Sequence, residues 1–569
     1  MLPGSRDAQI VVRFGMPPGM PAWLQSIARE GSRIPDHGSP AARTVTSPPT
    51  VRERHSARAI PRDRVTQALP ASRGLLVTIA EPAATVVLPS SIGHPTGPRG
   101  TTLSIHRLGG LNSRGEIRVP IGNASASGTF NPAAGIPAGP MDYEALLNEL
   151  YHLERFGIKL GLETITDLLG HMGNPHRRFK TLHVTGTNGK GSVCAYVASV
   201  LRKAGYRVGL YTSPHLVRFN ERIQVDGVEI PDADVARIYA EMQPAIAKTS
   251  GGSKVRQPTF FEVTTAMAFH YFAERKVDIG VIEVGMGGRM DATNVINPLV
   301  AVLTRIGLEH TEHLGKTEDR IAREKAGIIK AGCRVVTVDQ PTLPIIAAQA
   351  HALGCPVTVV GRDVRVERLG FDRSGQRLRM DDGGKVELRI PLLGSYQPEN
   401  AAIAYAAVRD LAKMGLEIPR EAIAAGFREV SWPGRMQIVR SDPTVVVDGT
   451  HNAPGVPTLV ASLRELFPGE KPVFVLGILD DKDLGVFADA LAPLAGRLVL
   501  ARPDTPRAYP PEAIARAFAA HVPDPEIVPK VSEAVDRAIA LAGRRGLVVV
   551  TGSIYTAGEA LAHLQGPKG

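Results

Sequence analysis

Short apolar runs alternate with helical patterns from about residue 180 onward. The strand-like runs are TLHVTG, RVGLYTS, IGVIEVG, LVAVLTRIG and RVVTVD. Stretches with apolar residues at helical spacing, such as SVCAYVASVLRKAG and FFEVTTAMAFHYFAERK, separate them. Apolar strands that alternate with helices are typical of a parallel sheet covered by helices on both faces. The pattern therefore predicts an α/β fold built on a parallel sheet.

The pattern changes at residues 356–391. The segments VTVVGRDVRVERLG, QRLRM and KVELRIPL, with Asp-Gly-Gly between the last two, favour antiparallel hairpins. The pattern then becomes helical again, and SWPGRMQ at 431–437 has the composition of a hinge. A second, smaller parallel sheet is indicated by TVVVDG, PVFVLGI, RLVLARP and GLVVVTGS. We therefore expect a central domain over 141–436 and a smaller, Rossmann-like C-terminal domain over 437–569.

Residues 1–140 follow neither pattern. They contain 18 prolines among Ser, Gly and Arg, although GLLVTIAEPAATVVL and PAWLQSIARE favour local order. Such a composition rarely supports a packed core, so we predict a disordered or low-complexity N-terminal extension. A targeting segment and translation from an upstream start are alternatives. The segment MDYEALLNELYHLERFGIKLGLE from Met141 has an amphipathic helical pattern, and the functional part of the chain is expected to begin there.

Charge is distributed unevenly along the chain. The formal net charge is +10, but residues 1–140 hold 15 Arg, no Lys and 7 acidic residues, so the rest of the chain is near neutral. The high pI is therefore poor support for a nucleic-acid partner. The sequence contains no run of 18 apolar residues, so no membrane span is expected. Three cysteines (Cys194, Cys333 and Cys355) favour a reducing compartment without disulfides, and we expect a cytoplasmic protein.

The segment LHVTGTNGKGSVCAY carries the strongest chemical signal. It combines a buried strand, a glycine-rich turn and the start of a helix, so the backbone N–H groups can converge on a phosphate. Lys190 adds a positive charge, and Ser192 adds a hydroxyl at the positive end of the helix. The spacing G-x-x-G-K-x-[ST] differs from the common phosphate-binding loop, but the order of parts is the same.

Polar residues follow several strands of the central pattern. Ser213, Glu283 and His310 each come at a strand end, where ligands of open α/β sheets bind. A hydroxyl, a carboxylate and an imidazole near a phosphate loop predict a divalent metal that bridges ATP phosphates. Lys325 lies on a mostly apolar helix face and is expected to point inward. In the second domain, Arg435 and the segment DGTHN predict a cluster that closes over a nucleotide from the far side.

The motifs now form a set that resembles a known family. In chain order they are GTNGKGS, YTSPHL, TFFE, EVGMGGRMDATN, EHTEHLG, REKAGI, QPENA, PGRMQ and DGTHN. Together they closely resemble the folylpolyglutamate synthase/dihydrofolate synthase family, a folate-specific branch of the Mur ligases, over residues 141–569. The departures are small: Met286 and Met290 replace leucines, and Glu312 stands where aspartate is usual.

The resemblance implies roles for individual residues. The residues expected to bind ATP are Thr187, Asn188, Gly189, Lys190, Gly191, Ser192, Asn400, Arg435, Asp448 and His451. Ser213, Glu283 and His310 are expected to bind magnesium, with two ions in all, and Lys325 to be carboxylated by CO2. Lys325, Lys190 and His310 are thus the expected catalytic residues. The segments expected to border a pterin substrate comprise Thr259, Phe260, Phe261, Glu262, Met290, Asp291 and Ala292.

The resemblance also implies an activity. The chain is expected to be an ATP-dependent ligase that joins L-glutamate to dihydropteroate and to tetrahydrofolate through an acyl phosphate. It is expected to act as a monomer, without membrane or nucleic-acid partners. Three alternatives remain open, of which two are enzymes and one has no enzymatic activity. The chain could be a monofunctional folylpolyglutamate synthase, a UDP-muramyl amino-acid ligase, or a nucleotide-binding scaffold without activity. Nucleic-acid binding by the arginine-rich residues 1–140 could coexist with any of them.

Overall fold

The computed structural model divides the chain into two compact units, residues 1–135 and 136–569. It describes residues 9–13, 77–80, 83–86, 103–104, 116–120, 143–153, 161–252, 256–522 and 524–566. In the first unit, β1 (Gln9–Arg13) pairs antiparallel with β5 (Glu116–Pro120). A second small sheet joins β2 (Val77–Ala80), β3 (Ala83–Val86) and β4 (Leu103–Ser104). The local order predicted for GLLVTIAEPAATVVL is confirmed as β2 and β3, whereas PAWLQSIARE and the expected disorder lie outside the described residues.

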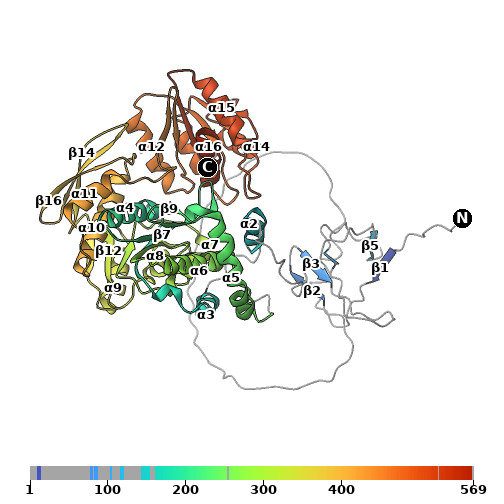
Figure 1. Cartoon of the computed structure of the whole chain (residues 1–569). Helices are drawn as coiled ribbons and strands as arrows, with labels where there is room; N and C mark the ends of the chain where they lie inside the picture. The colour runs from blue at the N-terminus through green and yellow to red at the C-terminus, as the bar shows by residue number, and fades with distance from the viewer. Residues whose placement is uncertain are drawn as a thin grey trace, which may run out of the picture. The chain divides into compact units, whose positions relative to one another are not determined.

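The second unit contains an eight-stranded sheet in the order β13-β12-β11-β6-β10-β7-β8-β9 (Figure 1). The six strands from β13 to β7 are parallel, and β8 and β9 continue antiparallel. The strands are β6 (Lys180–Thr185), β7 (Val208–Tyr211), β8 (Ile223–Val225), β9 (Val228–Glu229), β10 (Ile279–Glu283), β11 (Val300–Leu303), β12 (Arg334–Val338) and β13 (Val357–Val360). The predicted parallel sheet is confirmed.

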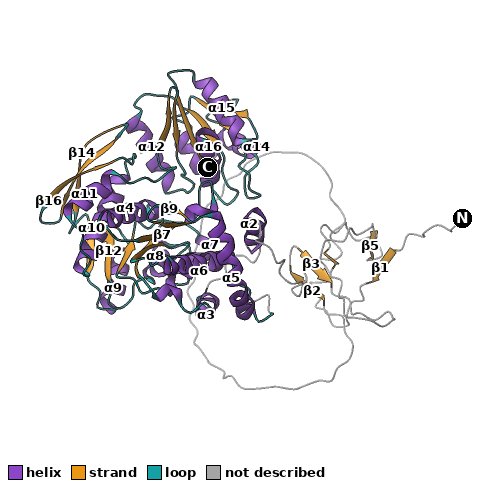
Figure 2. Cartoon of the chain, in the orientation of Figure 1, coloured by secondary structure: helices purple, strands orange, loops and turns teal. Residues whose placement is uncertain are grey.

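Helices cover both faces of this sheet, because neighbouring strand residues point to opposite faces (Figure 2). Leu182 and Val184 pack on one face with helices α4, α10 and α11. The other face packs against α5 and α6 near β10, and against α8 and α9 near β12. The helices of this lobe are α2 (Tyr143–His152), α3 (Glu163–His171), α4 (Lys190–Lys203), α5 (Asp232–Ser250), α6 (Phe260–Glu274), α7 (Thr311–Leu314), α8 (Glu318–Ala326), α9 (Leu343–Ala352), α10 (Gln397–Lys413) and α11 (Arg420–Arg428).

The hairpin prediction for residues 356–391 is correct in part. Strands β14 (Arg365–Asp372), β15 (Gly375–Asp381) and β16 (Lys385–Ile390) form an antiparallel sheet. The run Val357–Val360, however, is β13 and belongs to the edge of the parallel sheet. The Gly361 turn (φ +99°) separates the two, and sequence pattern did not distinguish a parallel edge strand from the first strand of a hairpin.

The C-terminal lobe has a six-stranded sheet in the order β17-β18-β22-β19-β20-β21. All pairs are parallel except β17 with β18, so the predicted smaller parallel sheet is confirmed with one antiparallel edge. Its strands are β17 (Gln437–Ser441), β18 (Thr444–Val447), β19 (Val473–Leu476), β20 (Arg497–Leu500), β21 (Glu526–Ile527) and β22 (Leu547–Thr551). Its helices are α12 (Gly455–Leu466), α13 (Leu484–Leu491), α14 (Pro511–Phe518), α15 (Val531–Ala542) and α16 (Ile554–Gln565).

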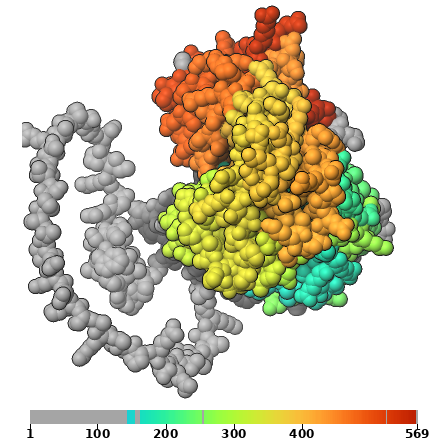
Figure 3. All heavy atoms as spheres, turned by 90° about the vertical axis from the view of Figure 1, so that its left-hand side faces the viewer, coloured from blue at the N-terminus to red at the C-terminus, as the bar shows by residue number. Residues whose placement is uncertain are grey.

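The β14–β16 sheet runs from the central lobe onto the C-terminal lobe, where it forms a ridge (Figure 3). The Arg368 guanidinium pairs with Glu465 of α12, and Arg373 pairs with Glu470 at 2.9 Å while covering the Phe467 ring. These contacts hold the far end of α12.

Within the described segments, none of the helices combines the length and apolar character that crossing a bilayer requires.

The packing of α4 against α11 gives a stability prediction. Phe427 is fully buried and stacks on Tyr196, with ring centroids 5.1 Å apart. Phe427→Ala should lower the free energy of unfolding by about 3–5 kcal/mol, because it removes a large apolar side chain and leaves a cavity. Phe371→Ala is the matched control, since Phe371 is 40% exposed and its loss should cost about 1 kcal/mol. Urea denaturation measures both, and equal effects would contradict the packing described.

Candidate active site

The glycine-rich turn lies between β6 and α4, as predicted. Gly186 has φ +147° and Gly189 has φ +89°, which are backbone conformations that favour glycine. Space also requires glycine, because a Cβ on Gly186 would lie 1.7 Å from the Thr304 hydroxyl oxygen. A Cβ on Gly189 would lie 2.3 Å from the Asn400 Oδ1. The turn therefore opens α4 with free N–H groups directed toward the space in front of it.

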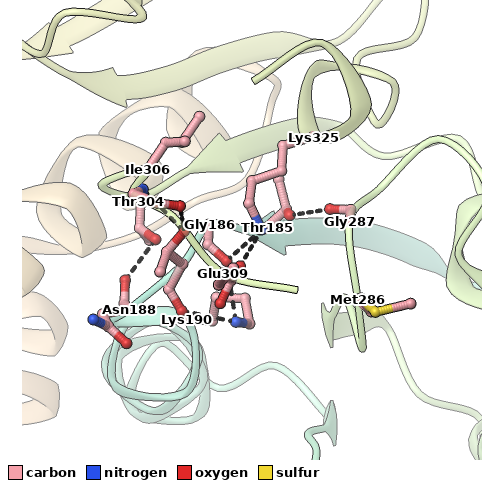
Figure 4. A network of polar contacts seen from close by, with 12 residues as sticks. Thr185, Gly186, Asn188, Lys190, Met286, Gly287, Thr304, Ile306, Glu309 and Lys325 are labelled. Carbon is pink, nitrogen blue, oxygen red and sulfur yellow. Dashed lines mark hydrogen bonds and ion pairs between the residues drawn. The ribbon is translucent and has the colours of Figure 1, made fainter. Parts of the chain in front are cut away.

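Side chains from β11 and its following loop fix this turn (Figure 4). Thr304 Oγ1 donates to the Asn188 carbonyl at 2.7 Å. The Thr187 hydroxyl donates to the Gly307 carbonyl at 3.0 Å and accepts from the Gly307 N–H at 3.0 Å. The ammonium of Lys190 folds back and donates to the Gly186 and Thr187 carbonyls, both at 3.1 Å. The loop is thus rigid before any ligand arrives.

A cavity of about 570 Å³ opens in front of the turn, and both lobes line it. Most residues singled out from the sequence meet there. They are Thr187, Asn188, Gly189, Lys190, Gly191, Ser192, Ser213, Glu283, His310, Asn400, Arg435 and His451. Trp432 and Tyr396 also line the cavity, although the sequence analysis did not single them out.

Glu283 ends β10 and is the buried acid of this cavity. It is 4% exposed, and one of its oxygens accepts the Ser213 N–H at 3.1 Å. Burial raises the pKa of Glu283 to about 6, and Lys190 opposes this only partly. No Lys or Arg among the described residues forms an ion pair with Glu283 within 4 Å. A buried carboxylate without a direct ion-pair partner among the described residues, in a cavity wall that also includes Ser213, fits a hard divalent ion such as Mg²⁺.

His310 lies at the N-terminal end of α7 with φ +45° and borders the same cavity. Desolvation lowers the pKa of His310, which favours the neutral imidazole that a metal requires. Ser213, Glu283 and His310 come from three different strand ends. Their donor atoms are two oxygens and a nitrogen, which suits a magnesium ion whose remaining positions are taken by phosphate and water.

Lys325 points inward from α8, as predicted. It is 1% exposed, and its Nζ donates to the Gly186 carbonyl at 2.8 Å and to Glu309 Oε1 at 2.6 Å (Figure 4). Burial lowers the pKa of Lys325 to about 8, although Glu309 opposes the shift. The amine is therefore more readily neutral, and nucleophilic, than an exposed lysine.

Glu309 is a site residue that the sequence analysis missed. Burial alone would raise its pKa, but Lys190 and Lys325 outweigh burial and lower the pKa of Glu309 to about 2. The available signal was its position immediately before His310 at the same strand end. It passed unnoticed because a carboxylate next to a candidate metal ligand was not distinguished from a solvated loop residue.

The C-terminal lobe contributes the opposite wall of the cavity. Asn452 and Asn188 exchange hydrogen bonds at 2.9 and 3.2 Å, so the amide pair joins the loop before α12 to the glycine-rich turn. His451 Nδ1 lies 2.9 Å from the Gly449 carbonyl, and burial lowers the pKa of His451 to about 4. A neutral ring at this wall favours contact with an uncharged nucleoside over contact with phosphate.

Asp448 does not line the cavity, although the sequence analysis grouped it with the ATP-binding residues. It is 1% exposed. Its carboxylate accepts the Met436 N–H at 2.8 Å, the Tyr396 hydroxyl at 3.2 Å and the Thr450 N–H at 2.9 Å. The side chain therefore organises the connection between the lobes, and its contact with ATP stays a prediction.

The two segments expected to border a pterin also lie outside the cavity lining. Glu262 and Thr259 form a capping box at the start of α6, where Glu262 accepts the Thr259 N–H at 2.8 Å. Asp291 accepts the Met286 and Thr293 N–H groups at 2.8 and 3.0 Å. Phe261 reaches closest to the site, because its ring packs against Gly285, which lines the cavity. The polar groups in these segments are thus engaged by the fold.

The remaining residues of these segments are apolar. Phe260 is 7% exposed and packs against Tyr151, with ring centroids 5.7 Å apart, while Ala292 is 6% exposed. Met290 is half-buried. The structure therefore does not bring the substrate segments together with the phosphate loop in one cavity.

A separate acidic grouping lies on the surface of α5 and α6. Glu241, His270 and Glu274 have ligand atoms within 4.8 Å of one another. Arg237 pairs with both glutamates at 2.9 Å and also with Asp234, so these carboxylates already have a cationic partner. This grouping is an exposed ion-pair network.

The turn geometry predicts the effect of one methyl group. Gly189→Ala should raise the KM for ATP about tenfold or more, because the new Cβ meets Asn400 and because φ is positive. Gly205→Ala is the matched control, since Gly205 has φ +88° and nothing within 4 Å of its added Cβ. Steady-state kinetics separates the two variants. Similar KM values in both would show that backbone strain alone, and not the contact with Asn400, sets the effect.

Comparison with known proteins identifies the family of this chain. The Mur ligase middle domain model matches residues 184–408, and the Mur ligase glutamate ligase domain model matches residues 434–554. The chain is 36% identical over 416 residues to the dihydrofolate synthase/folylpolyglutamate synthase of Bacillus subtilis, covering 70% of this chain and 94% of that protein.

It is also 37% identical over 428 residues to the probable bifunctional folylpolyglutamate synthase/dihydropteroate synthase of Haloferax volcanii, covering 74% of this chain and spanning half the length of that protein. The crystal structure of Mycobacterium tuberculosis folylpolyglutamate synthase complexed with ADP and AMPPCP superposes with a TM-score of 0.70 at 35% identity, covering 75% of this chain and all of that one. The chain therefore belongs to the folylpolyglutamate synthase/dihydrofolate synthase family of Mur ligases.

Proposed function

We propose that this ATP-dependent glutamate ligase of folate metabolism is bifunctional, adding L-glutamate both to dihydropteroate and to tetrahydrofolate. The observation that supports the proposal is one cavity lined by the phosphate loop and by the buried acid Glu283, with the buried Lys325 bonded to the loop from behind the lining. We further propose that residues 141–436 and 437–569 are its functional domains, that residues 1–140 are a dispensable extension, and that the monomer is active.

ATP is proposed to bind with its phosphates at Thr187–Ser192. The free N–H groups of the turn and the start of α4 would hold the phosphates, and Lys190 would exchange its two carbonyl partners for a phosphate oxygen. Asn400 and Arg435 line the same space. His451 would contact the nucleoside from the C-terminal lobe, and Asp448 would act through the backbone of Met436.

Ser213, Glu283 and His310 are proposed to hold magnesium. When bound, the ion would neutralise charge on the transferring phosphoryl group. The chain's own contribution is to keep the Glu283 carboxylate buried and fixed by the Ser213 N–H, so that it meets a cation without reorganising. Lys325 is proposed to react with CO2 and so supply a further carboxylate oxygen for a second magnesium.

The chemistry follows from the weakness of a carboxylate as an electrophile. Transfer of the γ-phosphoryl group to the folate carboxylate would create an acyl phosphate, and the amine of L-glutamate would then displace phosphate to form an amide. Acyl phosphates hydrolyse, so the cavity must exclude water. Movement of the C-terminal lobe about 431–437 would do this, and positive φ values at Gly434 and Met436 mark this segment as the bend.

Bifunctionality is supported by the B. subtilis relative, whose name carries both activities. A monofunctional folylpolyglutamate synthase is the competing proposal. The aromatic surface of Phe261 beside Gly285 would accommodate a flat pterin in either case. The choice therefore depends on which acid acceptor the cavity admits.

The proposal is tested by ADP release from the full chain with ATP, Mg²⁺ and L-glutamate. We expect turnover with dihydropteroate and also with tetrahydrofolate, because one acyl-activating cavity serves both acceptors. Mass spectrometry of the products should show one added glutamate in each case. Turnover with tetrahydrofolate alone would establish the monofunctional alternative, and turnover with a UDP-muramyl precursor in place of both would refute the folate assignment.

Lys325→Ala is expected to lower kcat about 100-fold or more, because it removes a buried group directed at the phosphate loop. Arg323→Ala is the control on the same helix, since Arg323 is exposed. Circular dichroism should show both variants folded. A kcat for Lys325→Ala near that of Arg323→Ala would remove Lys325 from the mechanism.

A further inference from the structure

Two cysteines that lie far apart in the sequence meet at the edge of the central sheet. Cys333 directly precedes β12, and Cys355, 22 residues later, lies two residues before β13. Their Sγ atoms are 3.9 Å apart, and the residues are 1% and 6% exposed. From the sequence we expected no disulfide, because only three cysteines in a long chain favour a reducing compartment.

The register of the sheet places the two residues opposite each other. Val335 of β12 pairs with Val357 of β13, and two residues earlier on each strand stand Cys333 and Cys355. The Val335 N–H donates to the Pro356 carbonyl at 2.8 Å and fixes this alignment. Neighbouring strands lie about 4.8 Å apart, which falls within the roughly 4.4–6.8 Å between Cα atoms that a disulfide spans. Side-chain rotation can therefore bring the sulfurs together without moving the strands.

We propose that Cys333 and Cys355 are a site of oxidative modification, at which a peroxide converts the two thiols into an intramolecular disulfide. One thiolate attacks the peroxide O–O bond and becomes a sulfenic acid. The second thiol then attacks that sulfur, forms the S–S bond and expels water. In sum, two thiols and one hydrogen peroxide give one disulfide and two water molecules, so sulfur is oxidised and peroxide oxygen is reduced.

The surroundings of the two cysteines determine how readily peroxide reaches them and how fast they are oxidised. Strand β13 is the outermost strand of the central sheet, so local opening at this edge exposes the pair more readily than opening in the middle. The Cys355 thiol donates to the Lys330 carbonyl at 3.2 Å, and this bond must break first. Burial also raises the pKa of Cys333 to about 11, which makes the reaction slow.

The consequence is a cross-link remote from the cavity. The pair lies at the amino ends of β12 and β13, whereas the cavity lies beyond the carboxyl ends of the strands. The bond closes a loop that contains α9 and so restricts the unfolded chain. The oxidised protein should keep its ligase turnover and unfold at a higher urea concentration.

The test uses the purified full chain treated with hydrogen peroxide. Free thiols are then alkylated under denaturing conditions, and the unreduced digest is examined by mass spectrometry. We expect the Cys333 and Cys355 peptides joined, with loss of two hydrogen atoms. Cys194 should be alkylated, because it lies in a different core cluster on α4.

Two variants sharpen the result. Cys355→Ser should abolish the link and leave Cys333 as sulfenic or sulfinic acid, whereas Cys194→Ser should keep the link. In the linked wild type, the urea midpoint should rise and turnover should stay within twofold of the reduced protein. The proposal is overturned if Cys333 becomes sulfinic acid without linkage in the wild type, if the link involves Cys194, or if linkage forms only in urea.

Discussion

Two lysine ammonium groups converge on one carbonyl oxygen at the centre of this molecule. Lys190 from α4 and Lys325 from α8 both donate to the Gly186 carbonyl, at 3.1 and 2.8 Å. Like charges at such close range repel, and burial of Lys325 adds a desolvation cost. Glu309 balances one of the two charges. The remaining positive charge, together with the free N–H groups of the turn, makes the cavity receptive to an anion and explains why the phosphate loop is so firmly held.

The second constraint is the attachment of α12, the helix that carries the C-terminal wall of the cavity. At its N-terminal end, Asn452 exchanges hydrogen bonds with Asn188 of the phosphate loop. Near its C-terminal end, Ser462 accepts the Ser395 N–H at 3.0 Å and Glu465 pairs with Arg368 of β14. The C-terminal lobe is thus held at two points well separated along one helix. The hinge movement that we propose at 431–437 would open one of these attachments while the other stays formed.

Much of the fold follows from local pattern. The alternation of apolar strands with helices gave both sheets, and the glycine-rich turn was recognised because glycine, lysine, hydroxyl and helix occur in sequence over few residues. Three results depended on long-range packing. The run Val357–Val360 joined the parallel sheet, because the crossover through α9 places it beside β12 rather than beside the hairpin strands that follow it. Glu309 became a site residue through its distance to Lys325, and Cys333 met Cys355 through strand register.

The motif carboxylates that do not line the cavity share a physical property. Glu262, Asp291 and Asp448 are carboxylates in the recognised motifs, and each is buried and accepts backbone N–H groups. A buried carboxylate must be satisfied somewhere, and loops without regular hydrogen bonding offer the most unpaired N–H donors. Motif carboxylates therefore include those that shape the loops of a site and those that face its ligand. Glu283 also accepts one backbone N–H, from Ser213, but it lines the cavity, and we propose that it is of the second kind. The sequence pattern marks both kinds alike, and the place of each carboxylate relative to the cavity distinguishes them.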